Sequence, residues 1–125
     1  MLIVLDDMAN EEQIPKQEWE KMFRENAKRL ELVPETPRLW VNRARLMMLD
    51  DHPEDHEPSG LDEIDKCILQ ALELEPEHLE ALEEAAHFYD VIIPDRAKAM
   101  LYAQRYIDVA EKVVHDMQAI IDDSN

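Results

Sequence analysis

The chain has 125 residues, with one glycine, one cysteine and 30 acidic against 13 basic side chains, for a formal net charge of -17. This is the length of one domain. One glycine cannot form a dinucleotide fingerprint, a phosphate-binding loop or a nucleophile elbow, because each needs two or more glycines at fixed spacing. Enzymes of those classes are therefore excluded. The negative charge repels phosphates, so we expect no nucleic-acid partner.

The single cysteine, Cys67, has no partner for an internal disulfide or a Cys-based zinc site, which indicates a reducing compartment. The longest apolar run, residues 1–5, is far shorter than a membrane span and lacks the basic flank of a secretion signal. We therefore expect a cytoplasmic protein that does not contact membranes, and we expect Cys67 to pack in the core.

Helices are predicted throughout the chain, because prolines separate stretches in which apolar residues recur three or four positions apart. We expect helices at roughly 16–33, 37–49 and 61–75, a fourth that follows Pro76 and reaches about Tyr89, and a long fifth at about 95–121. Thr36 and Asp95 are the expected N-caps. Residues 1–15 are expected to form an arm or a short helix, and residues 16–125 a helical domain.

The last predicted helix is the longest, as expected of a terminal helix that covers the open end of a helical stack. Its apolar residues keep a helical period without a breaker. They are Ala97, Met100, Leu101, Ala110, Val113, Val114, Met117, Ile120 and Ile121.

Two segments of the chain are similar to each other: LELVPETPRLW at 30–40 and LELEPEHLEAL at 72–82. In both, a large apolar residue follows the proline by six positions, a small residue comes four later, and a large one three after that. These residues are Trp40, Ala44 and Met47 in one copy and Leu82, Ala86 and Tyr89 in the other. The pattern resembles the tetratricopeptide repeat.

This resemblance implies an all-α fold, a right-handed stack of antiparallel helix pairs with a long C-terminal capping helix. The first helix of each pair then lines a concave groove that binds a peptide or a helix of a partner. By resemblance, the groove residues are Arg38, Val41, Arg45, Met48, Glu80, Glu83, His87 and Asp90. An alternative for the charged ones is that Arg38 or Arg45 simply pairs with Glu80 or Glu83 across neighbouring helices.

An acidic insertion at about 50–60 lengthens the turn inside the first repeat. His52 and His56 stand there among five carboxylates and are the candidate ligands for a divalent metal. Pro53 and Pro58 prevent a continuous helix from aligning the two histidines, and no known metal-loop spacing is present. A solvated loop is therefore the favoured interpretation, and we expect no metal or other cofactor.

The expected function is non-catalytic, a scaffold or adaptor that binds a protein segment. The paired carboxylates lie on exposed helix surfaces without the apolar pocket that a general acid needs. The second half of the groove is acidic, which favours a basic or amphipathic partner segment. The alternative is a homo-oligomeric structural protein that buries apolar residues such as Ile92, Ile93 or the run at 1–5 between copies.

Overall fold

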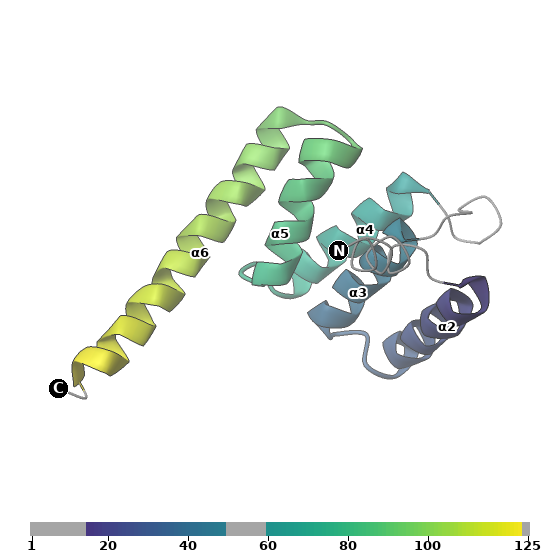
Figure 1. Cartoon of the computed structure of the whole chain (residues 1–125), viewed down its shortest axis with the longest axis horizontal. Coiled ribbons are helices and arrows are strands. Elements are labelled where there is room, and N and C mark those ends of the chain that lie inside the picture. The colour runs from purple at the N-terminus through teal and green to yellow at the C-terminus, as the bar shows by residue number, and fades with distance from the viewer. Residues whose placement is uncertain (1–14, 50–59, 124–125) are drawn as a thin grey trace, which may run out of the picture.

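The computed structural model describes residues 15–49 and 60–123, and within these ranges the chain is helical and contains no strand (Figure 1). The elements are α2 (Lys16–Leu32), α3 (Pro37–Met48), α4 (Leu61–Leu74), α5 (Leu79–His87), the π-helical turn η2 (Phe88–Ile92) and α6 (Arg96–Asp123). The expected all-α class is confirmed, and the helix ends follow the prolines closely. The expected arm at the start of the chain and most of the insertion loop lie outside the described residues.

The helix starts follow from local chemistry. Pro37 is the first residue of α3, where its missing N–H costs no hydrogen bond. Thr36 is the N-cap residue of α3, as expected, although its side chain makes no cap hydrogen bond. Asp95 does cap α6, since its Oδ1 accepts the Lys98 N–H at 3.2 Å. Gly60 precedes α4 with a φ of 109°, a conformation that side chains other than glycine rarely adopt.

The helices pack around one apolar core. α3 packs closely on α4, α5 packs closely on α6 and also touches α3 and α4, and α2 lies mainly against α3. Together α2 to α5 form the body of the molecule, and α6 leans on α5 at one end of it (Figure 1). The largest side chains with no exposed surface are Phe88, Ile68, Leu82 and Val41.

Alanines form the closest helix contacts. Ala44, Ala71, Ala81 and Ala85 have no exposed surface, and small side chains allow helix axes to approach. On α5, Ala86 is the small residue of the second repeat copy and is half-buried, whereas its neighbour Ala85 has no exposed surface.

The end of the fourth helix is not a plain α-helix. From Phe88 to Ile92 the chain forms a π-helical turn, and the Ile93 N–H bonds to the Phe88 carbonyl at 2.9 Å. This wider turn buries two consecutive aromatic residues, Phe88 and Tyr89, whose rings meet edge to face with centroids 5.3 Å apart. The expected helix up to Tyr89 is therefore corrected to an α-helix that ends at His87 followed by η2.

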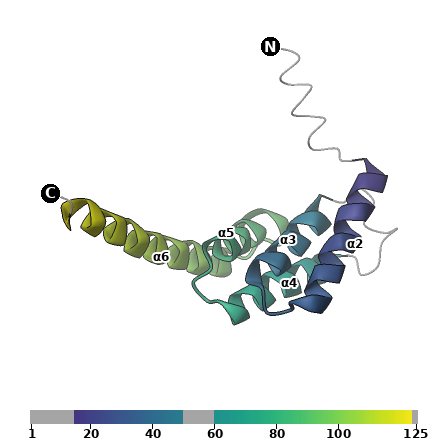
Figure 2. The ribbon, with the colours of Figure 1, turned by 90° about the horizontal axis from the view of Figure 1, so that it is seen from below.

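The second half of α6 extends beyond the body as an arm (Figure 2). Its first half packs on the core through one stripe, which contains Ala99, Tyr102, Tyr106 and Val109. All residues from 111 to 123 are exposed. Ala97, Met100 and Leu101 are exposed, and so is every apolar residue after Ala110, so α6 covers the stack with only part of its length. The reason is length, because α6 has 28 residues and α5 only nine, so the supporting surface ends half-way along α6.

Candidate partner-binding surface

Of the groove residues predicted on α3, all but Val41 keep some exposed surface. Arg38 is exposed and Arg45 is half-buried. Val41 has no exposed surface and Met48 packs against the core. The assignment of Val41 to a partner-binding groove is therefore corrected, because α4 and α5 both pack on α3 and cover that part of its surface.

The predicted residues of the second repeat are all at the surface. Glu83, His87 and Asp90 are exposed, and Glu80 is half-buried. His87 Nε2 lies 4.0 Å from Glu83 Oε1, one helical turn away on α5.

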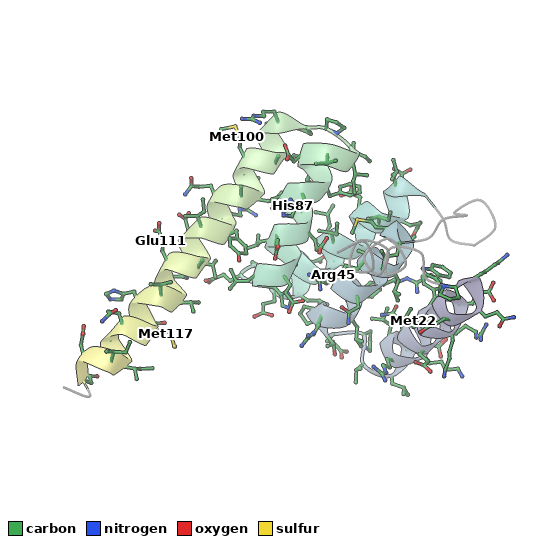
Figure 3. All side chains as sticks on the ribbon, in the orientation of Figure 1. Met22, Arg45, His87, Met100, Glu111 and Met117 are labelled. Atoms are coloured by element: carbon green, nitrogen blue, oxygen red, sulfur yellow. The ribbon has the colours of Figure 1, made fainter. Side chains whose placement is uncertain are left out.

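Arg45 joins α3 to α5 through two carboxylates (Figure 3). Its Nη1 lies 3.0 Å from Glu80 Oε2, and its Nε donates to Glu84 Oε1 at 2.7 Å. Burial of Arg45 acts to lower its pKa, but the hydrogen bonds and charges of Glu84 and Glu80 outweigh this and raise it. Because Arg45 and Glu80 are more than a third exposed, each pair contributes only about 0–1 kcal/mol to stability.

The expected pairing of Arg45 with Glu80 is thus confirmed, and Glu84 was missed. Glu84 follows Glu80 by four residues, so the two carboxylates share one face of α5. Two carboxylates at this spacing can bind one basic side chain together, so the spacing is the feature of the sequence that predicts the second partner of Arg45. After this pairing, the charge that remains on the outer surface of α5 and η2 comes from Glu83 and Asp90.

A buried tyrosine ties η2 to α4. The Tyr89 hydroxyl donates a hydrogen bond to Asp65 Oδ1, and its ring stacks on Tyr102 of α6 with centroids 5.7 Å apart. Burial raises the pKa of Tyr89, and the hydrogen bond to the Asp65 carboxylate raises it further. A phenol held neutral in this way acts as a packing group with one satisfied polar end.

Cys67 is a buried core residue, as expected, with 4% of its surface exposed. Burial raises the pKa of its thiol to about 11, although Arg43 acts in the opposite direction. Only the thiolate is nucleophilic, and its fraction falls tenfold for each pKa unit.

We therefore expect alkylation of Cys67 by iodoacetamide at mildly alkaline pH to be at least about a hundredfold slower in the folded protein than in urea. A synthetic peptide with the sequence of α4, measured in the same two solvents, controls for the effect of urea on the reagent. Mass spectrometry of the quenched reaction follows the label. Equal rates in buffer and in urea would mean that the thiol is open to solvent.

In the part of the chain that the structure describes, no group of three histidine, cysteine, aspartate or glutamate residues is arranged to hold a metal ion. The candidate ligands His52 and His56 lie outside that part. His78 has a different role, since it is the N-cap of α5 and its Nδ1 accepts the Ala81 N–H at 3.2 Å. Among the described helices, none is long and apolar enough to cross a membrane.

Exposed apolar side chains lie mainly on α6. Of the two isoleucines expected to be buried between copies, Ile92 is 37% exposed, whereas Ile93 packs partly into the core. The run at 1–5 lies outside the described residues. On α6, by contrast, Val114 is 67% and Ile120 is 59% exposed. Beside them, an open hollow separates α6 from the turn at Pro76 and Glu77, and Lys112 crosses it to pair with Glu77.

Comparison of the chain with models of protein families, with curated proteins and with solved structures gives no significant match. No functional residue can therefore be transferred from a relative. The case for a function depends on the surfaces of the chain itself.

Proposed function

We propose that this chain is a non-catalytic protein-binding module built from two tetratricopeptide-like helix pairs, α3 with α4 and α5 with α6, in a right-handed stack. The exposed surface where α3 lies beside α5 binds a basic or amphipathic helical segment of a partner. The packing of α3 on α4, of α5 on α6, and of α5 back on α3 supports this arrangement. In proteins built from such repeats, the surface formed by the first helix of each repeat binds peptides and helices of other proteins.

The observation that carries the proposal is that Arg45 is already paired within the protein. This cation is already held by Glu80 and Glu84, so it is not available to an acidic ligand. The neighbouring carboxylates of Glu83 and Asp90 remain exposed. Residues 60–95 contain eleven acidic side chains and one lysine, so the field around this surface is negative and attracts a cationic segment.

A paired charge reversal, Glu83→Lys with Asp90→Lys, tests this surface. Both side chains are exposed and neither bonds Arg45, so the fold should be unchanged. We expect at least a tenfold loss of affinity for a fluorescent lysine- and leucine-rich helical peptide, measured by anisotropy at low salt. The binding of the wild type should weaken as salt rises, because exposed charges are screened.

The matched control is Asp62→Lys with Glu73→Lys, which makes the same change in net charge at exposed positions of α4. This control should keep most of the affinity. If both double variants lose affinity equally, the peptide responds only to net charge and the α3–α5 surface is not a specific site.

A further inference from the structure

Within the described residues, the second half of α6 forms an arm with an apolar face that is largely exposed. Ile107, Val114, Met117 and Ile121 are 46%, 67%, 52% and 56% exposed, respectively. The polar residues of this segment occupy the rest of the helix surface, and Glu111, which Figure 3 labels together with Met117, borders the apolar face. A helix with one wide apolar face normally packs that face against another element.

The spacing on this face is that of a two-helix seam. Ile107, Ala110, Val114, Met117 and Ile121 follow one another at intervals of three, four, three and four residues. This is the a and d pattern of a coiled coil, with branched side chains at every a position and the small Ala110 at a d position. The seam spans about 21 Å along the helix at 1.5 Å per residue.

The order of charges along α6 identifies the occupant. Residues 96–107 contain three basic and no acidic side chains, whereas residues 108–123 contain five acidic and one basic. This order is the reverse of what the helix dipole favours, because the first turn has no acidic residue and the last turn has no basic one. A second helix with the same sequence in the opposite direction corrects both mismatches and places basic residues beside acidic ones.

We propose that two copies of this chain associate through an antiparallel pairing of their α6 helices over residues 107–121, centred near Val114. In this register Ile107 of one copy lies level with Ile121 of the second copy. Arg105, which is exposed, lies level with Asp122 and Asp123 of the second copy. The body does not cover this face, since the stripe that packs on the core ends at Val109.

Sedimentation over a wide concentration range tests the pairing. The wild-type protein should pass from the monomer mass of 14.7 kDa to twice that value in the micromolar range. Val114→Glu places a charge in the seam and should weaken association at least tenfold. Ala119→Glu adds the same charge on the exposed polar side of the same helix and should associate like the wild type. A wild-type protein that stays monomeric at all concentrations overturns the proposal, whether residues 1–14 or solvent covers the face.

The direction of pairing is tested by a mixing experiment. Arg105→Glu and the double variant Asp122→Lys with Asp123→Lys should each associate at least tenfold more weakly than the wild type, because like charges then meet at both ends of the seam. An equimolar mixture should recover wild-type association, since every opposed pair in the mixed dimer is again of opposite sign. No recovery would overturn the antiparallel arrangement. Circular dichroism of each variant confirms that α6 remains helical.

This inference does not depend on the binding surface proposed for α3 and α5. Glu83→Lys with Asp90→Lys changes residues far from the seam in the sequence and should leave the sedimentation behaviour as in the wild type. The double variant should lose peptide binding but still dimerise. Val114→Glu should lose dimerisation but still bind the peptide, so the two surfaces can be tested separately.

Discussion

Ala71→Glu is expected to lower the free energy of unfolding by several kcal/mol, so that the protein unfolds easily. Ala71 has no exposed surface and lies in the core cluster on α4. A glutamate there either buries an unpaired carboxylate or forces neighbouring helices apart, and each outcome costs several kcal/mol of a total stability of about 5–15 kcal/mol. Urea unfolding monitored by circular dichroism measures the loss.

The control is Leu69→Glu, which introduces the same side chain two residues earlier on α4, at a position that is 39% exposed. The free energy of unfolding of this variant should lie within about 1 kcal/mol of the wild-type value, as is usual for surface substitutions. If Ala71→Glu were as stable as Leu69→Glu, the packing of α4 in the core would be wrong.

Trp19→Ala is expected to destabilise the protein by about 3–5 kcal/mol and to loosen α2 first. Trp19 is 4% exposed, stacks on Phe23 with ring centroids 4.8 Å apart, and donates its Nε1–H to the Leu46 carbonyl of α3 at 2.6 Å. Since α2 packs mainly on α3, the loss of this side chain removes the principal attachment of the helix. Thermal unfolding by circular dichroism gives the loss, and Trp40 then remains as the fluorescent reporter on α3.

Trp19→Phe is the matched variant for this position. It keeps an aromatic ring beside Phe23 but removes the hydrogen bond to Leu46, so about 1–3 kcal/mol should be lost. A loss as large as that of Trp19→Ala would show that the hydrogen bond, and not the packing, attaches α2. No loss in either variant would place α2 elsewhere.

The helices could be predicted from the sequence because prolines and helical spacing are local signals. Pro34, Pro76 and Pro94 interrupt helices directly, since proline lacks the N–H that a helix interior needs. The π-helical turn could not be predicted in this way. It is selected by the burial of Phe88 and Tyr89 together, which depends on the shape of the surrounding core and not on the spacing of their neighbours.

The candidate binding surface was predictable only in part. The pairing of Arg45 with Glu80 follows from charge and repeat alignment, and the structure confirms it. Val41 was misassigned because its alignment with a groove position ignores how tightly α4 and α5 close on α3. The bare half of α6 was missed for a related reason. An apolar face predicts that a helix has a neighbour, but spacing alone does not say whether the neighbour belongs to the same chain.

The second half of α6 should be less stably folded than the first half, because it extends beyond the body of the protein. An isolated helix as short as residues 110–123 is only marginally stable in water, because little tertiary contact offsets the entropy of fixing its backbone. Its backbone amides should therefore exchange with solvent far faster than those of residues 96–109 in the same helix. Any molecule that covers the apolar face stabilises the helix by mass action, so folding of the last four turns becomes a readout of occupancy.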